Sequence, residues 1–415
     1  MGVMAKIARD CFRVDNYNYP KADVLTIAHD IDRNFKYGSK YYSPLIDTIE
    51  DQIKLNGVKT ISFARIISTL KGDISHGNAY SPEGGFARAM LLKRFKGVFL
   101  KGKYPYSHYE ERIWGKILDK TGAKKIIGIQ PSRELCIACK KRGVWVADVQ
   151  HGNISEGHKW YGISFRGDQP KEWLPDDFLV WDNASAGVLE WVKEKGSNCT
   201  VIGNRWLIRF VKNDENDPIV KYAQEASKWN TIVDNGKKNI LVTMQWGQQN
   251  DPLLVGGYIS KELEKVILST SDKYNWCLRL HPNQLNGFSV EEGERFVNYY
   301  KTILKGHAEY LETTAAPLPL VLRGCSLHIT WFSSTVHETN LIGMNSALLD
   351  PECFPGGKRS KVYEHLLAEG RTFLVKNEKA NIITWIDNNI AQHEQSQLSQ
   401  TTEENYEKLI QFLSN

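Results

Sequence analysis

The chain has 415 residues, 41% of them hydrophobic and 24% charged, a composition typical of a globular protein with room for two hydrophobic cores. Its net charge of +5 and sequence pI of 8.6 are too weak to indicate a nucleic-acid-binding protein. These values suit an enzyme that handles anionic ligands.

The N-terminal residues 1–20 carry charges throughout and lack the apolar core of a signal peptide. No run of about 18 apolar residues predicts a membrane span, so we expect a cytoplasmic protein whose membrane contact, if any, is peripheral at the inner face. The seven cysteines are odd in number and scattered, as in reduced cytosolic proteins. Cys136 and Cys139 have CxxC spacing, but no second pair accompanies them, which favours packing over a redox or metal role.

The first half of the chain alternates predicted strands and helices. Short β-branched apolar runs predict strands at 23–29, 59–63, 125–129, 144–149, 178–181 and 200–203. Apolar residues at helical spacing predict helices at 44–55, 109–118, 133–142 and 186–195. Residues 36–42 are expected to form an exposed loop, and residues 83–85 a flexible loop. Strands separated by helices indicate a parallel sheet covered on both faces.

A second series begins after the polar, turn-rich stretch 213–218, which predicts a linker within 212–235. Strands are expected at 239–244, 275–280, 327–331 and 346–349, helices at 260–269, 290–304, 318–323 and 335–343, and a last amphipathic helix at 403–413. We therefore predict an N-terminal Rossmann-like acceptor domain at 1–212, a C-terminal Rossmann-like nucleotide-donor domain at 236–395 and a C-terminal helix at 396–415. Ligands of such sheets bind beyond the carboxyl ends of the strands.

Two strand ends of the second domain carry residues suited to a nucleotide. Gln245, Trp246 and Gly247 follow the strand 239–244, and the glycine lets backbone approach a ligand closely. Arg279 and His281 are two apart on the next strand, and Pro282 holds His281 extended. A guanidinium and an imidazole there would grip a phosphate or polarise a leaving group.

The third strand end of this domain is a helix start. Ser333, Ser334 and Thr335 place hydroxyls at a helix N-terminus, which favours anions. A helix cap needs one such hydroxyl, so three favour a phosphate site. Glu338, one turn further, either accepts hydrogen bonds from ribose hydroxyls or is a first-turn carboxylate favoured by the helix dipole.

The first domain offers acid–base groups after the strand 144–149. Asp148 and His151 stand together at its end, and such a pair acts as base, acid or nucleophile. Gln150 and Gly152 complete this turn on the acceptor side. Two further histidines are candidate acceptor contacts: His158, with a surface role as the alternative, and His29, which ends the first strand.

These segments together resemble the GT-B glycosyltransferases of bacterial surface polysaccharides, over about residues 20–390. The His281-Pro282 and Ser333-Ser334-Thr335 pieces are similar to those of bacterial sialyltransferases, polysialyltransferases and capsule Kdo transferases, which use CMP-sugars. Teichoic-acid glycerophosphotransferases carry a comparable Arg-x-His-Pro and an analogous His-Gly turn, with Trp where this chain has Gln150. The resemblance implies a GT-B-like α/β fold, with two Rossmann-like domains whose parallel sheets face across a cleft, and donor contacts from the His-Pro and Ser segments.

We therefore expect a metal-independent glycosyltransferase without a cofactor. It would move a sugar from a nucleotide-activated donor, a CMP-ulosonic acid such as Kdo or sialic acid being favoured, to a glycan or glycolipid of capsule, lipopolysaccharide or O-antigen. If the reaction inverts stereochemistry, His151 or Asp148 is the general base; if it retains, Asp148 is the better nucleophile. The alternatives are a glycerophosphotransferase of teichoic-acid type, a nucleotide-sugar epimerase of the same fold and a non-catalytic carbohydrate-binding protein.

Overall fold

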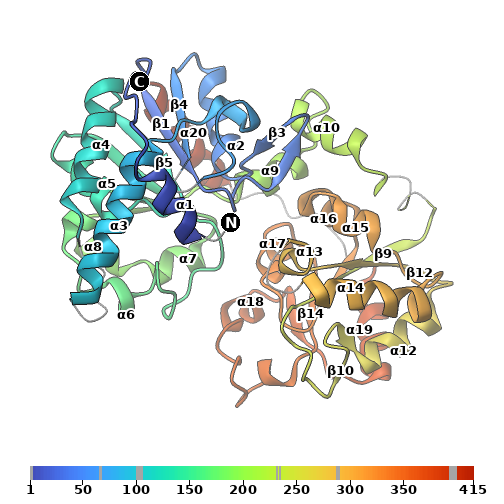
Figure 1. Ribbon diagram of the computed structural model, residues 1–415. Helices are drawn as coiled ribbons and strands as arrows, with labels where there is room; N and C mark the ends of the chain where they lie inside the picture. The colour runs from blue at the N-terminus through green and yellow to red at the C-terminus, as the bar shows by residue number, and fades with distance from the viewer. Residues whose placement is uncertain are drawn as a thin grey trace. The chain divides into compact units, whose positions relative to one another are not determined.

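The computed structural model describes residues 3–64, 68–99, 106–229, 232, 235–286, 290–391 and 400–415. The chain divides into two compact units (Figure 1). Unit 1 is Met1–Trp206 with Ser399–Asn415, and unit 2 is Leu207–Leu398. The predicted boundary at 395/396 lies outside the described residues.

Unit 1 contains a six-stranded parallel sheet in the order β4-β1-β5-β6-β7-β8. Its strands are β1 Val24–Ala28, β4 Thr60–Ala64, β5 Lys125–Gly128, β6 Trp145–Val149, β7 Asp177–Val180 and β8 Asn198–Val201, with an antiparallel hairpin of β2 Phe35–Tyr37 and β3 Lys40–Tyr42. Its helices are α1 Val3–Asp10, α2 Ile46–Leu55, α3 Glu83–Phe99, α4 His108–Thr121, α5 Arg133–Lys140, α6 Ile163–Arg166, α7 Asn183–Val188, α8 Trp191–Glu194 and α20 Gln400–Ser414. Helix α9, Arg205–Lys212, begins at the end of unit 1 and runs into unit 2, and short 3-10 turns lie at Gly72–Ile74, His76–Asn78 and Lys171–Trp173.

Helices cover both faces of this sheet. On one face α4 and α5 bury Ile113, Ile117 and Leu135 against the strands. On the other, α2 and α20 bury residues such as Ile49 and Leu409. The repeat of apolar residues every three or four positions along α2 and α4 explains why these segments are helices with one buried face.

Unit 2 contains a five-stranded parallel sheet in the order β12-β9-β13-β14-β15. Its strands are β9 Lys238–Thr243, β12 Tyr274–Arg279, β13 Leu327–Thr330, β14 Ser346–Leu348 and β15 Thr372–Leu374, with a small pair of β10 Leu254–Val255 and β11 Ile259–Ser260. Its helices are α10 Pro218–Ala226, α12 Lys261–Thr270, α13 Pro282–Asn286, α14 Val290–Tyr299, α15 Leu311–Ala315, α16 Leu318–Gly324, α17 Thr335–Leu341, α18 Glu364–Ala368 and α19 Lys379–Asn389. A π-helical turn follows at Tyr300–Leu304 and a 3-10 turn at Pro351–Cys353. Its main core joins α12, α14 and α19 to the strands through residues such as Val266, Phe296 and Ile386.

The predicted strands of both sheets are confirmed to within one or two residues, and β15 is an additional strand. The expected loop at 36–42 is wrong, because it forms the β2–β3 hairpin, which turns at Gly38 with a φ of 61°. The predicted helix at 186–195 is two short helices, α7 and α8. The polar linker holds α10, which Asp217 caps by accepting hydrogen bonds from the N–H groups of Ile219 and Val220; residues 230, 231, 233 and 234 of this stretch lie outside the described residues.

The expected loop at 83–85 is also wrong, because it is the first turn of the 17-residue helix α3. The Asp15 carboxylate accepts hydrogen bonds from the N–H groups of Gly84 and Gly85 and so caps the helix from far away in the sequence. A Cβ atom on Gly84 would lie 2.0 Å from the Arg13 carbonyl oxygen, so only glycine admits this crossing.

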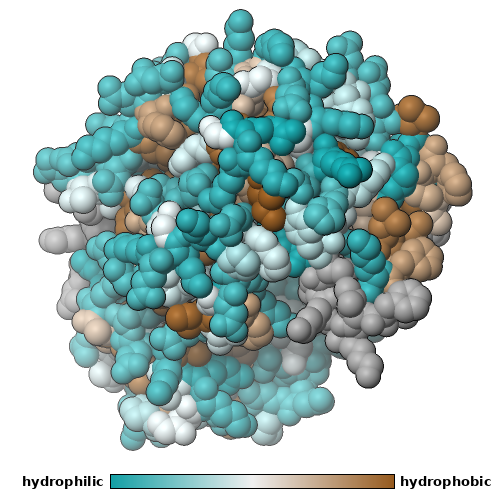
Figure 2. Space-filling view, turned by 90° about the vertical axis from the view of Figure 1, so that its left-hand side faces the viewer, coloured by the Kyte–Doolittle hydropathy of each residue, from teal (hydrophilic) through white to brown (hydrophobic). Residues whose placement is uncertain are grey.

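The C-terminal helix, expected as an element after the donor domain, packs on unit 1. The Arg205 guanidinium pairs with Glu403 at 2.6 Å and lies 3.6 Å from the Tyr406 ring centroid. Within the described ranges, the helices include none long and apolar enough to cross a membrane. Figure 2 shows a largely hydrophilic face on which hydrophobic residues form small groups, several of them toward the right-hand edge of the view.

Candidate functional site

Three neighbouring strands of unit 2 end at the same edge of the sheet. Thr243, the last residue of β9, is in register with Arg279 at the end of β12 and with Thr330 at the end of β13. The segments that follow, 244–247, 280–282 and 331–335, therefore start side by side. This is the edge at which parallel α/β sheets bind ligands.

Gln245 and Trp246 have different surroundings in the first of these segments. Gln245 is buried, and its amide donates to Thr330 Oγ1 at 2.8 Å, so this side chain ties two strand ends together. Trp246 is 40% exposed, and its ring centroid lies 6.0 Å from that of His281. Gly247 has a φ of 75°, and its N–H donates to the buried Glu292 carboxylate at 3.1 Å.

His281 is half-buried at the end of β12, and burial lowers the pKa of its imidazole. Its Nδ1 accepts a hydrogen bond from the Asn283 N–H at 3.1 Å, which places the proton of the neutral ring on Nε2. Its backbone N–H donates to Gln284 Oε1 at 2.8 Å. Pro282, exposed, begins α13. His281 thus offers a neutral N–H donor at the strand end.

The Arg279 guanidinium points to backbone carbonyls rather than to the expected phosphate position. It donates to the carbonyl oxygens of Thr313 and Ala316, the latter at 2.8 Å, at the C-terminal end of α15. Burial alone lowers the pKa of Arg279, to about 10. In this structure Arg279 fastens α15 to the strand end.

The third segment leads from β13 into α17. Ser333 Oγ accepts from the Thr335 N–H at 3.2 Å and donates to Thr335 Oγ1 at 3.0 Å. Ser334 is the N-cap residue of α17, but its exposed side chain makes no capping bond. Glu338 lies in the first turn of α17, where burial raises the pKa of its carboxyl to about 7, against a hydrogen bond from its own backbone N–H. The segment therefore combines one exposed hydroxyl group, that of Ser334, with a carboxyl that titrates near pH 7.

A buried histidine lies beneath these strand ends. His328 on β13 is fully buried, with Nε2 2.7 Å from Thr243 Oγ1 and Nδ1 3.0 Å from Ser346 Oγ. Burial lowers the pKa of His328 to about 3, so the ring stays neutral. Its two bonds cross-link β9, β13 and β14.

In unit 1 the neighbouring strands β1, β5 and β6 likewise end together. Asp148 on β6 is 1% exposed, and both carboxylate oxygens are engaged: Oδ1 accepts from the Gln130 N–H at 2.9 Å and Oδ2 from the Trp160 indole N–H at 2.7 Å. Gln130 follows β5 with a φ of 48°, a strained value for a residue other than glycine. Asp148 thus fixes the backbone and side chains around it rather than facing solvent.

His151 is partly exposed and held from both ring nitrogens. Its Nε2 is 3.1 Å from the Gln130 amide nitrogen, and its Nδ1 is 2.9 Å from the Tyr161 hydroxyl. With the Gln130 amide nitrogen donating, Nε2 accepts and Nδ1 carries the proton. Burial, and next the charge of Asp148, raise the pKa of Tyr161 well above its usual range, and Asp32 adds to this effect. The His158 ring is tilted by 32° against that of Tyr161, with 5.0 Å between the ring centroids, and burial lowers the pKa of His158.

Gln150 is buried and bonds the protein itself. Its Oε1 accepts from the Trp181 N–H at 2.7 Å and its Nε2 donates to the carbonyl oxygen of Gly152 at 2.9 Å. It therefore joins the end of β7 to the turn that carries His151. We infer a positioning role for Gln150 in place of an acceptor contact.

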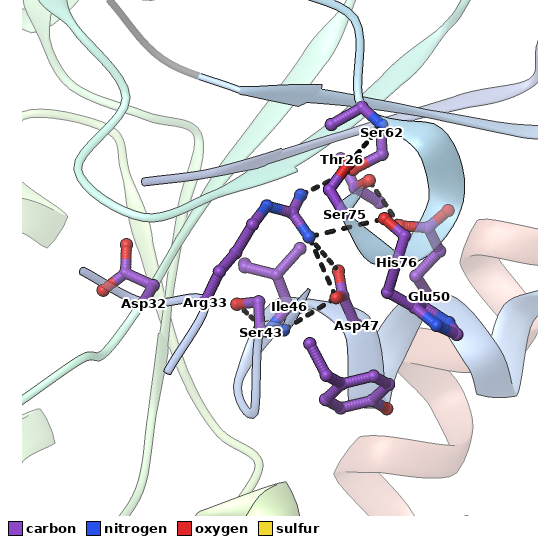
Figure 3. A network of polar contacts seen from close by, with 12 residues as sticks. Thr26, Asp32, Arg33, Ser43, Ile46, Asp47, Glu50, Ser62, Ser75 and His76 are labelled. Carbon is purple, nitrogen blue, oxygen red and sulfur yellow. Dashed lines mark hydrogen bonds and ion pairs between the residues drawn. The ribbon is translucent and has the colours of Figure 1, made fainter. Parts of the chain in front are cut away.

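His29 lies on a loop that a buried polar network anchors (Figure 3). The Arg33 guanidinium, fully buried, donates to Asp47 Oδ2 at 3.0 Å and to Ser62 Oγ at 2.9 Å. Burial raises the pKa of Asp47, and the charge of Arg33 opposes this rise. Asp32 points away from this network and accepts from the His29 N–H at 3.1 Å. The network thus holds His29 and Asp32 at the end of β1.

Three further residues hold these strand ends and were not predicted from the sequence: Gln130, Gln284 and Glu292. Gln130 directly follows a predicted strand and precedes Pro131, so its place in the sequence indicated a strand-end residue. Nothing in the sequence indicated Glu292, because its contact with Gly247 spans 45 residues. In the part of the chain that the structure describes, no three His, Cys, Asp or Glu side chains are grouped to hold a metal ion. Cys136 and Cys139 are buried free thiols, and burial raises the pKa of Cys136 to about 12.

Neither the protein-family models nor the curated proteins compared with this sequence match it. Among solved structures, the chain is similar to the UDP-GlcNAc 2-epimerase from Methanocaldococcus jannaschii, with 12% identity, 94% of this chain and 99% of that chain covered, and a TM-score of 0.55. It is similar to the UDP-GlcNAc 2-epimerase from Neisseria meningitidis bound to UDP-GlcNAc, at 13% identity, 94% and 94% coverage and a TM-score of 0.52. The wall teichoic acid polymerase TagF matches at 12% identity, 99% and 92% coverage and a TM-score of 0.54.

At these identities the likeness establishes the fold alone. With the two parallel sheets, it confirms the predicted GT-B-like α/β class. The similar structures are enzymes of this fold.

Proposed function

We propose that this chain is a glycosyltransferase that uses a nucleotide-activated sugar, with CMP-ulosonic acids as the favoured donors. The observation that carries the proposal is the meeting of Trp246, His281 and the segment Ser333–Glu338 at three adjacent strand ends of unit 2. An aromatic face, a neutral N–H donor, hydroxyl groups and a carboxyl together match the parts of a nucleotide.

Each part of the donor has a counterpart. Trp246 provides a face for the base, and Glu338 accepts hydrogen bonds from the ribose hydroxyls. His281 Nε2–H and the hydroxyls of Ser334 and Thr335 donate to the phosphate, which leaves with the bonding electrons when the sugar–phosphate C–O bond breaks. Gln245, Gly247 and Arg279 hold the strand ends, as their bonds within unit 2 suggest.

Unit 1 supplies the base in this proposal. His151 takes the proton from the acceptor hydroxyl on Nε2, the nitrogen that accepts from the Gln130 amide in the structure, as the acceptor oxygen displaces that amide and the new C–O bond forms. Asp148 keeps Gln130 and Trp160 in place and so positions His151 through the Gln130 amide. His29, His158 and Gly152 border the acceptor. Unit 1 thereby receives the glycan or glycolipid.

The solved structures of the same fold support a nucleotide-sugar donor class, since one is a UDP-GlcNAc 2-epimerase bound to UDP-GlcNAc and others are of the TagF polymerase. They also keep two alternatives in view, an epimerase of UDP-GlcNAc type and a polymerase of teichoic-acid type. An epimerase would convert its nucleotide sugar without an acceptor.

Thermal denaturation of the purified protein with CMP, CDP, UDP and GDP tests the proposal. A ligand at about a hundred times its Kd stabilises the folded state by about 2.7 kcal/mol, and we expect the largest shift with CMP. His281→Ala should abolish most of the shift, whereas His307→Ala, a histidine of unit 2 that bonds Ser271, should retain it. No shift with any of the four nucleotides would contradict the proposal. Stabilisation by UDP with acceptor-free conversion of UDP-GlcNAc would replace it with the epimerase.

A further inference from the structure

The N-terminal segment and α3 of unit 1 present large apolar side chains to solvent. Phe12 is 86% and Val14 95% exposed, while Leu92 and Phe95, one turn apart on α3, are 46% and 61% exposed. Arg88 on α3 donates to the carbonyl oxygens of Cys11 and Arg13, each at 2.8 Å, so the two segments are joined. Exposed apolar groups that gather in this way mark a contact surface.

Basic side chains surround these apolar groups. Residues 83–99 contain four basic residues, Arg88, Lys93, Arg94 and Lys96, against the single acid Glu83, a net charge of +3. A cavity of about 260 Å³ between α3 and the start of α4 is lined by residues that include Leu92, Lys96 and Arg112, and no carboxylate is among its lining residues. Apolar and cationic groups therefore share one hollow.

The acids of this region face inward. The side chains of Asp10, Asp15 and Glu83 are 3%, 6% and 5% exposed. Their partners are more exposed: Arg9, which pairs with Asp10, is 50% exposed, Arg13, which pairs with Asp10 and Glu83, is 53%, and Arg88, which pairs with Asp15, is 36%. Asp15 thus caps α3, and the three buried carboxylates hold the arginines, whose side chains are more exposed than the carboxylates.

We propose that unit 1 docks on an anionic phospholipid bilayer through this basic–apolar face, defined as Phe12, Val14, Leu92, Phe95, Lys96 and Arg112. The apolar side chains enter the interface, and the cations meet the lipid phosphates. A small anion in solution would leave Phe12 and Val14 unused. A second copy of the chain would bring two positive faces together, which charge repulsion opposes. The inference is independent of the reaction that the enzyme carries out.

Flotation of the full chain with phosphatidylcholine vesicles, with and without phosphatidylglycerol, tests the proposal. We expect binding only to the anionic vesicles, weakened as NaCl is raised from about 0.1 M to about 1 M. The double variant Lys96→Ala/Arg112→Ala should bind about twenty-five-fold more weakly, about fivefold for each cation. Lys171→Ala/Lys193→Ala, a pair of exposed lysines elsewhere on unit 1, should bind like the unaltered protein.

Phe12→Ser/Phe95→Ser tests the apolar part. Because both side chains are exposed, the Tm should not change, while vesicle binding should fall at least about tenfold. Equal binding to both vesicle types, or equal losses in the two lysine-containing pairs, would overturn the proposal. So would a dimer in sedimentation velocity that the Phe12→Ser/Phe95→Ser variant dissolves, because the face would then be an interface between two copies.

Discussion

Ionisation of Glu338 should couple to nucleotide binding. Burial raises the pKa of this carboxyl to about 7, and in the proposed site its ionised form accepts hydrogen bonds from the ribose. At a pKa near 7 the group is almost fully ionised at about pH 8 and about one tenth ionised at pH 6. The affinity for CMP should therefore fall about tenfold over these two pH units, or about 1.4 kcal/mol.

Titration calorimetry with CMP measures this slope, and Glu338→Gln supplies the comparison. The amide keeps the shape of the side chain but does not titrate. CMP binding to this variant should therefore lose the component of the pH dependence that comes from Glu338. Glu364→Gln, an exposed carboxyl on α18 of the same unit, should keep the full slope. 2′-Deoxy-CMP, which lacks one of the two ribose hydroxyls, should show a smaller slope with the unaltered protein.

The free protein provides a second measure of the same group. Because the folded pKa lies above the unfolded value of 4.5, the folded state binds more protons, and stability rises as the pH falls from about 7 to about 4.5. Glu338→Gln should thus stabilise the protein by up to about 3 kcal/mol at pH 8 and give no such gain near pH 4.5, as judged by urea denaturation. If the pH dependence of CMP affinity is identical in Glu338→Gln and the unaltered protein, the ribose contact is refuted. An equal stability gain at both pH values would refute the raised pKa of Glu338.

Three further changes test other parts of the two units. His328, with a folded pKa of about 3, binds its proton less readily than in the unfolded chain, so the free energy of unfolding should fall by about 1.4 kcal/mol per pH unit below about 6.5. In His328→Asn, urea denaturation should show a weaker dependence of this free energy on pH. Gln130→Gly relieves the positive φ and should raise the Tm in calorimetry, while transfer slows because His151 loses a partner. Asp148→Asn places an amide N–H against the N–H donors of Gln130 and Trp160. It should lower kcat strongly and leave CMP affinity unchanged, and normal turnover would show that Asp148 has no part in the mechanism.

The parallel strands were predictable because each is a short β-branched apolar run buried on both faces, as the fully buried run Val24–Ala28 illustrates. The order of the strands within each sheet could not be predicted from these apolar runs. The carboxyl ends nevertheless identify the segments after β9, β12 and β13, because in a parallel sheet every such end lies at one edge.

Helix α3 was missed because its start depends on contacts that are distant in the sequence. Gly84 and Gly85 disfavour a helix by their own propensity. Asp15 reverses this by capping both N–H groups from about 70 residues away, and the glycines admit the Arg13 carbonyl against the helix. The attachment of α20 to unit 1 has a similar origin, since the pair of Arg205 and Glu403 spans 198 residues.

The positions of the candidate residues at strand ends were predictable from the sequence, but the hydrogen bonds of their side chains were not. Arg279, Gln150 and Asp148 lie at the expected strand ends, yet each side chain is hydrogen-bonded within the protein. Arg279 bonds carbonyls of α15, and Gln150 bonds the end of β7 and its own turn. Asp148 bonds Gln130 and Trp160. Sequence spacing fixes which face of a strand a side chain leaves from. It does not reveal whether a hydrogen-bond partner from the protein itself, such as a backbone carbonyl or an indole N–H, lies beside that side chain.

In both units, buried polar groups hold the strand ends, and more exposed polar groups extend beyond them. Asp148 and His328 lie beneath the strand ends, where they accept or exchange hydrogen bonds with neighbouring strands and loops, while His151 and His281 project beyond them. A buried group that loses its partners costs about 1–3 kcal/mol of stability, so replacing Asp148 or His328 should lower stability and activity together. Replacing His281, which is half-buried and accepts one backbone bond, should lower activity at nearly constant stability. Stability and turnover measured on the same variants therefore separate the residues that hold the site from those that act in it.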